Sequence, residues 1–135
     1  MIKRILVVDD EEPIQELIHL YLAPIGVRLH AAYTGEDGVS MYAEMLEAGM
    51  RPDLVIMDLK LPGIDGIETI NRIMAMDPTA CIFGFTAYSK SVWGSEMLNA
   101  GALQVIPRTI GFAGLRDIVN DSLFSDEMMI SYHSQ

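Results

Sequence analysis

Several residue types are scarce in this chain of 135 residues, and each scarcity excludes a class of protein. The single cysteine, Cys81, can form neither an internal disulfide nor a thiolate metal cluster, so nothing points to an oxidising compartment. Nine lysines and arginines stand against nineteen acids, and the formal net charge of -10 is opposite in sign to that of a typical nucleic-acid-binding domain. We therefore expect no disulfide framework and no direct contact with DNA or RNA.

Long apolar runs and nucleotide-binding loops are missing as well. No stretch approaches the roughly 18 to 20 apolar residues that cross a bilayer, and the start "MIKRILVVDDEE" reaches acids too early for a signal peptide. The chain contains neither a Gly-rich dinucleotide loop nor a P-loop. Half of the residues are apolar, enough for one ordinary core. We expect one soluble, cytoplasmic domain that binds no membrane and needs no dinucleotide or NTP cofactor.

Strand-like and helix-like segments alternate along the chain. Apolar runs at 5–8, 54–57 and 81–85 are typical of strands buried on both faces of a parallel sheet. The alternating segment 27–33 is typical of an edge strand, and residues 102–106 can supply a fifth strand. Apolar residues at helical spacing mark the segments between and after these strands, for example Ile14, Ile18 and Leu22; Val39, Tyr42 and Leu46; Ile67, Ile70 and Met74; and Leu115, Val119 and Leu123.

Repeated alternation of strands and helices at this length predicts an α/β fold. We expect a flavodoxin-like, doubly wound five-stranded parallel sheet in the order 2-1-3-4-5, with five helices on its two faces. Residues 1–123 would form this domain, and 124–135 would be a C-terminal tail or an extension of the last helix. In such a sheet, ligands bind at the carboxyl ends of strands 1 and 3, where the strand order reverses.

Acidic residues follow both of those strands. Asp9 and Asp10 come directly after the first strand, and Asp58 comes directly after the third. Carboxylates brought this close repel one another unless a cation joins them, and an all-oxygen site of this kind suits Mg²⁺. The alternative is that the first acids, with Glu11, only cap the following helix; one of them is expected to do so, but capping does not explain Asp58.

Three motifs, in this order, resemble the receiver domains of two-component response regulators: "ILVVDDE", "DLVIMDLKLPGIDG" and "FTAYS". The resemblance covers residues 1–123. It implies that Asp58 is the phosphoacceptor, that Asp10 is a direct ligand of Mg²⁺ (or Mn²⁺), and that Asp9 is an outer or water-mediated ligand. The backbone carbonyl of Lys60 would complete the protein ligands.

The resemblance also implies a function in signalling. Asp58 would take a phosphoryl group from the phosphohistidine of a sensor histidine kinase or phosphotransfer protein, with Mg²⁺ offsetting the charge. Thr86 would hydrogen-bond a phosphoryl oxygen, and a downstream protein effector would read the result. The domain would not be a conventional enzyme, although it would catalyse its own phosphorylation and dephosphorylation.

The chain departs from the family pattern around the fifth strand. A Lys-Pro pair joined by a cis peptide bond is replaced by Arg108-Thr109, so the phosphoryl-binding cation would be a planar, forked guanidinium. Without proline we expect a trans bond there, and trans also at Ile106-Pro107. The aromatic residue that usually moves with the switch threonine is replaced by Val105, which has no ring.

These departures keep a second function open. A degenerate receiver that binds partners without phosphorylation is favoured by Val105 and Arg108-Thr109, and is opposed by the intact acids and Thr86. A small aspartyl phosphohydrolase is disfavoured, because no acid lies two residues after Asp58. Lys60 and Tyr88 could shield the phosphoryl group or could simply be exposed.

Overall fold

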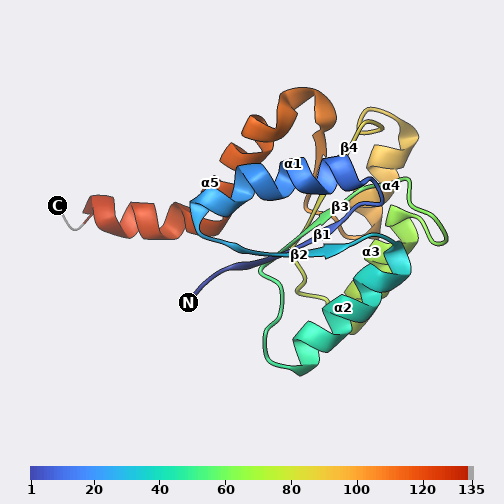
Figure 1. Ribbon diagram of the computed structural model, residues 1–135, viewed down its shortest axis with the longest axis horizontal. Helices are drawn as coiled ribbons and strands as arrows, with labels where there is room; N and C mark the ends of the chain where they lie inside the picture. Colours follow the sequence, from blue (N-terminus) through green and yellow to red (C-terminus); the bar gives the residue numbers. More distant parts are fainter. Residues whose placement is uncertain (134–135) are drawn as a thin grey trace.

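The sheet of this protein contains five parallel strands in the order β2-β1-β3-β4-β5 (Figure 1). We describe a computed structural model, which covers the backbone of residues 1–133 and the side chains of residues 1–125. The strands are β1 (Arg4–Val8), β2 (Arg28–Ala32), β3 (Leu54–Met57), β4 (Ile82–Thr86) and β5 (Gln104–Pro107). The predicted strand order and fold class are confirmed.

Helices cover both faces of the sheet. Helices α1 and α5 lie together on one face, and α2, α3 and α4 lie on the other (Figure 1). The bounds are α1 (Glu12–Leu22), α2 (Gly35–Glu47), α3 (Gly66–Met76), α4 (Val92–Ala100) and α5 (Gly111–His133), with short 3-10 turns η1 (Ala23–Ile25) and η2 (Arg108–Ile110). None of the described helices is both long and apolar enough to cross a membrane.

The central strands are buried on both faces, and their side chains divide between two cores. Leu6 and Val8 of β1 pack toward α2, α3 and α4, whereas Ile5 and Val7 pack toward α1 and α5. All four side chains have no measurable exposure. Because side chains of a strand alternate between faces, this double burial explains the uninterrupted apolar runs of the sequence.

Strand boundaries and peptide geometry near the sheet's carboxyl end agree closely with the sequence. β3 has the predicted bounds, and β4 begins and ends one residue later than predicted, so that it includes Thr86. β5 starts at Gln104, two residues later than predicted. The described residues contain no cis peptide bond, so Ile106-Pro107 and Arg108-Thr109 are trans as predicted.

The prediction that an acid caps α1 with its side chain is wrong. Glu11 occupies the N-cap position but makes no capping hydrogen bond with its side chain. Oδ1 of Asp9 instead accepts the backbone N–H of Glu11 at 2.9 Å, ahead of the helix. Pro13 in the first turn needs no hydrogen-bond acceptor, which reduces the need for a cap. The acids after β1 are therefore available for another role.

Candidate functional site

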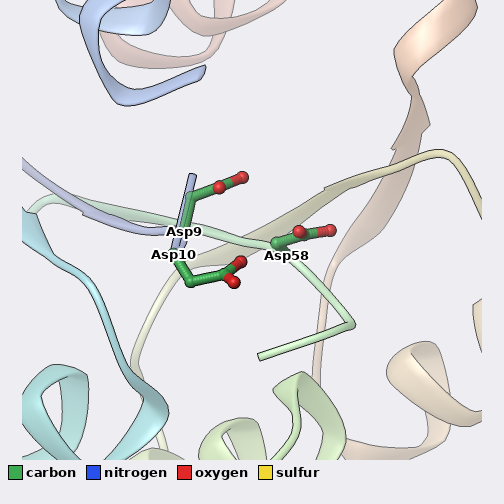
Figure 2. A group of neighbouring side chains, drawn as sticks. All are labelled: Asp9, Asp10 and Asp58. Carbon is green, nitrogen blue, oxygen red and sulfur yellow. The ribbon is translucent and has the colours of Figure 1, made fainter. Parts of the chain in front are cut away.

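Three carboxylates meet at the carboxyl end of the sheet. Asp9 and Asp10 follow β1 and Asp58 follows the adjacent strand β3, and Figure 2 shows their side chains extending side by side from the two strand ends. One oxygen atom from each of the three lies within 4.8 Å of the other two. Asp9 and Asp58 are 1% and 9% exposed, whereas Asp10 is open to solvent. The predicted convergence of these three acids is thus present in the fold.

Backbone hydrogen bonds hold the two strand ends in register. The N–H of Asp58 donates to the carbonyl of Val8 at 3.0 Å, which continues the β1–β3 pairing by one step. The buried amide of Gln15, on α1, donates to the backbone carbonyls of Val7, Asp9 and Ala32 at 3.0 to 3.1 Å. Gln15 therefore links α1 to the ends of β1 and β2 and fixes the backbone that carries Asp9.

A glycine allows the loop after Asp58 to close tightly. The N–H of Gly66, the first residue of α3, donates to the carbonyl of Leu59 at 2.7 Å. A Cβ atom at Gly66 would overlap the backbone carbonyl of Asp58. Because only glycine fits this close approach of two backbone segments, Gly66 sets the path of the loop that carries the predicted acceptor.

Arg108 supplies the cation of the cluster. Its Nη2 atom lies 2.6 Å from Oδ2 of Asp9 and 3.7 Å from Oδ2 of Asp58. Its Nε donates to the backbone carbonyl of Phe85 at 3.2 Å, and the guanidinium lies 4.6 Å from the centre of the Phe85 ring. The residue predicted to bind a phosphoryl group is thus beside Asp58, but its short contact is with Asp9.

One guanidinium does not offset the cost of gathering these carboxylates. Burial raises the pKa of Asp9 to about 6. The negative charge of Asp58 also raises this pKa, whereas the backbone N–H of Glu11 and the guanidinium of Arg108 lower it. Burial also raises the pKa of Asp58, although Arg108, the N–H of Leu59 and the hydroxyl of Thr86 oppose it. Clustered carboxylates whose negative charge is not fully offset form the all-oxygen set of ligands that Mg²⁺ prefers.

The entrance to the cluster is a hollow of about 330 Å³. Its lining includes Asp58, Arg108 and the small Ala87. The Nζ atom of Lys60 lies 4.5 Å from the centre of the Tyr88 ring, so these two side chains form a cation–π pair at the rim. Lys60 and Tyr88, which were considered separately in the sequence, are therefore paired with each other in the lining of this hollow.

Thr86 ends β4 next to this hollow and is fully buried. Its hydroxyl oxygen accepts the backbone N–H of Tyr88 at 3.2 Å. A second hollow, of about 620 Å³, lies beside the first and is lined by Asp10, Lys60 and the half-exposed Trp93 of α4, among others. The predicted site residues are thus gathered at one end of the sheet; the part assigned to the Lys60 carbonyl stays a prediction.

Sequence reasoning missed Gln15, Gly66 and Phe85 as supports of the site. Gln15 is a polar residue among the apolar positions of α1, a signal that could have been noticed. Gly66 follows Asp65, whose side chain caps α3 by accepting the N–H of Glu68 at 2.9 Å, and a glycine at such a helix start can mark close packing. Phe85 gives no sequence signal beyond its place in a buried strand.

Comparison with known families identifies the chain. The model of the response regulator receiver domain matches residues 5–120. The chain belongs to this family. Receiver domains are signalling modules that bind Mg²⁺ at an acidic pocket, and this chain has an acidic cluster, formed by Asp9, Asp10 and Asp58. Membership does not favour the degenerate alternative.

Curated relatives differ in how much of their length the receiver domain spans. It is 30% identical to sporulation initiation phosphotransferase F of Bacillus subtilis, over 91% of this chain and 95% of that protein. It is 28% identical to the regulatory protein AtoC of Escherichia coli, over 90% of this chain but only 25% of that protein. The chain thus spans about a quarter of the length of AtoC and nearly all of the Bacillus protein.

Solved receiver structures share the fold. The response regulator TrrA of Thermotoga maritima, solved in complex with Mg²⁺ and BeF, is 34% identical, with a TM-score of 0.74 over 90% of this chain and 100% of that one. CheY in the CheX–CheY–BeF3–Mg²⁺ complex of Borrelia burgdorferi is 25% identical, with a TM-score of 0.80 over 90% and 89% of the two chains. Both support the five-stranded receiver architecture described above.

Proposed function

We propose that this receiver domain accepts a phosphoryl group on Asp58 from the phosphohistidine of a sensor histidine kinase or phosphotransfer protein. The observation that carries the proposal is the convergence of Asp9, Asp10 and Asp58 at the carboxyl end of the sheet, with an accessible hollow in front of them. The named function of the Bacillus relative and the Mg²⁺ and BeF present in the TrrA complex support it. A downstream protein effector would respond to the phosphorylated form.

Hydrogen bonding within the site distinguishes the two oxygens of Asp58. Oδ1 accepts the backbone N–H of Leu59 at 2.8 Å, and Oδ2 lies 3.7 Å from Nη2 of Arg108. Oδ2, which lacks the backbone bond, is the nucleophile. It attacks phosphorus as the N–P bond breaks; the electron pair of that bond stays on the imidazole nitrogen, and the ring, protonated on its other nitrogen, leaves uncharged.

The other residues hold the group that is transferred. Arg108 would donate N–H groups to phosphoryl oxygens, and the buried hydroxyl of Thr86 would donate another hydrogen bond. Asp10, Asp58 and the Lys60 carbonyl would hold Mg²⁺, with Asp9 contributing through water. A bound Mg²⁺ would supply charge neutralisation for the nucleophile and the phosphoryl oxygens. The Lys60–Tyr88 pair at the rim would limit the access of water to the acyl phosphate.

Intact-mass analysis with acetyl phosphate and Mg²⁺ tests this function. We expect one phosphoryl adduct on the parent protein and none on Asp58→Asn. Asp65→Asn is the matched control, because it removes a nearby carboxylate yet keeps an oxygen for capping α3, and it should be phosphorylated like the parent. An unmodified parent, or an adduct that persists on Asp58→Asn, would overturn the assignment of Asp58.

A phosphohistidine donor then tests the source of the group. Incubation with a phosphorylated histidine phosphotransfer protein should move the label to the parent and to Asp65→Asn, but not to Asp58→Asn. Chelation of Mg²⁺ should abolish the transfer, because the carboxylates then lack the cation that offsets their charge. Transfer that is equally fast in chelator would contradict the proposed role of the metal.

A further inference from the structure

Arg108 is held by two groups at once, and only one of them belongs to the acidic cluster. On one side its Nη2 contacts Oδ2 of Asp9 at 2.6 Å. On the other side its Nε donates to the carbonyl of Phe85, and its guanidinium lies over the ring of the same residue at 4.6 Å. The side chain of Arg108 is 19% exposed, so the fork is confined between the carboxylates and β4.

The charges around the fork change when Asp58 is phosphorylated. In the structure Nη2 is bonded to Asp9, at 2.6 Å, and is only near Asp58, at 3.7 Å. A phosphoryl group carries nearly twice the charge of a carboxylate and offers three strong acceptor oxygens. The attraction of Arg108 toward position 58 therefore increases, while its attraction to Asp9 does not.

A guanidinium cannot shift toward position 58 without altering its contacts with Phe85. The N–H donors of arginine are fixed in one plane, so moving Nη2 turns the whole fork and changes the Nε hydrogen bond, the stacking on the ring, or both. A lysine at position 108 would carry a single rotatable ammonium and would have no such plane. The link between movement of residue 108 and the contacts of Phe85 thus depends on the arginine that replaces the expected lysine.

The Phe85 ring leads away from the site toward α1 and α5. It meets Phe112, in the first turn of α5, edge to face at a centroid distance of 5.8 Å. Phe112 in turn lies 5.9 Å from the ring of Tyr21, on α1. Rings in contact at these distances pack closely, so a change at Phe85 displaces its neighbours rather than being absorbed locally.

This row of rings lies on the opposite face of the sheet from Val105. Phe85 and Phe112 belong to the core under α1 and α5, whereas Val105 packs against the core under α2, α3 and α4. Val105 has no ring that could move in response to Thr86. The chain therefore lacks an aromatic side chain at that position of β5 and has an aromatic row on the other face.

We propose that Arg108 senses phosphorylation of Asp58 and that Phe85, Phe112 and Tyr21 carry the change to the α1–α5 side of the domain. This inference rests on the proposed phosphorylation of Asp58. In the resting state Arg108 is bonded to Asp9 and stacked on Phe85; in the loaded state it turns toward the phosphoryl oxygens. Phe85 is a positioning residue in this scheme, because it acts through Arg108.

NMR spectroscopy with beryllofluoride and Mg²⁺ tests the inference. Fluorine spectra report whether the analogue is bound, and backbone spectra of the same sample report which residues respond. We expect loading of the parent to shift Phe112, Tyr21 and Arg116, which lies over the Tyr21 ring, in addition to residues of the site. Absence of bound analogue on the parent would overturn the phosphorylation proposal and this inference with it.

Two variants test which residues carry the response from Asp58 to α1 and α5. In Phe112→Leu, which alters no residue of the acidic cluster, loading should still shift Phe85 and Arg108 but the response of Tyr21 should be lost. In Arg108→Lys, compared with the parent at equal occupancy, the responses of both Phe112 and Tyr21 should be lost. Arg72→Lys, altered in an exposed pair with Glu68, is the matched control and should respond like the parent.

The result that would overturn the inference is distinct from a failure of phosphorylation. A parent that binds the analogue but shows no shift on α1 or α5 would contradict the proposed route. So would a response of Tyr21 that persists at equal occupancy in Arg108→Lys or in Phe112→Leu.

Discussion

Asp9 at the carboxyl end of the sheet and Asp77 near its amino end each contact an arginine, yet the pKa of Asp9 is raised and that of Asp77 is lowered. Asp77 accepts hydrogen bonds from the hydroxyl of Tyr42 at 2.6 Å and from the hydroxyl and N–H of Thr79, and it pairs with Arg51. Each of these contacts favours the charged carboxylate.

Asp9 differs in burial and in its neighbours. Burial is the main cause of its raised pKa, and the charge of Asp58 adds to it. Arg108, its only ion-pair partner among the described side chains, is also drawn to Asp58. A contact between an acid and an arginine therefore does not by itself stabilise the charged carboxylate. At the amino end of the sheet, Arg51 adds to the hydrogen bonds that already favour the charge of Asp77. At the carboxyl end, Arg108 leaves Asp9 and Asp58 with an excess of negative charge that a ligand can offset.

The largest expected effect on stability comes from removing Asp77, at the amino end of the sheet. Asp77→Ala should lower the free energy of unfolding by about 3 kcal/mol, because it leaves the fully buried Tyr42 without its acceptor and removes the partner of Arg51. Urea denaturation at pH 7 measures the change. A loss as small as that of Asp117→Asn, an exposed surface acid expected to cost under about 0.5 kcal/mol, would remove the contrast between the two ends.

Tyr42→Phe should have a smaller effect that depends on pH. At neutral pH it removes a hydrogen bond to a charged acceptor and should cost about 1.5 kcal/mol. The folded-state pKa of Asp77 is below the ordinary value of 3.8, so the stabilisation is present above that value and is lost as the pH falls through the folded-state pKa. The difference in stability between the two proteins should therefore begin to shrink only as the pH falls below 3.8, toward the folded-state pKa of Asp77.

Denaturation curves recorded from pH 7 down to pH 3 measure this decrease in the difference. Tyr33→Phe, altered at an exposed ring, is the control and should differ from the parent by a constant small amount. A difference between Tyr42→Phe and the parent that stays constant across this range would show that the hydroxyl does not act through the charge of Asp77.

Asp58→Asn should have the smallest effect on the free energy of unfolding, and it should stabilise the domain whereas the other two substitutions destabilise it. In Mg²⁺-free buffer at pH 7.5 it should raise the free energy of unfolding by about 1 kcal/mol, because burial raises the pKa of Asp58 and the neutral amide avoids that cost. Added Mg²⁺ should stabilise the parent more than the variant. Thermal denaturation with and without Mg²⁺ measures both effects; a destabilised variant would mean that Arg108 already compensates the charge fully.

The fold was predictable from the sequence because strands that are buried on both faces of the sheet consist of continuous runs of apolar residues. Ile5 to Val8 and Leu54 to Met57 could hardly be anything but central strands, and the order of the strands placed Asp9 and Asp58 at one edge. Boundaries at the less buried β5 were less certain, because Gln104 is exposed and its neighbours carry a weaker pattern.

Pairings that depend on three-dimensional geometry could not be predicted in the same way. Arg108 was expected near Asp58, but its short contact with Asp9, ninety-nine residues away, depends on the path of the loop after β5. The Tyr42–Asp77 contact joins α2 to the end of α3 and leaves no periodic signal. The wrong expectation of an acidic cap on α1 has the same origin, since the direction of the Asp9 side chain is set by the turn at Glu11.

Trp93 gives the molecule a spectroscopic advantage. It is the only tryptophan in the chain, it is half exposed, and it lines the hollow shared with Asp10 and Lys60. Its fluorescence emission can therefore be assigned to one place without labelling. Rapid-mixing fluorescence can follow events beside the acidic cluster in real time on the unmodified protein.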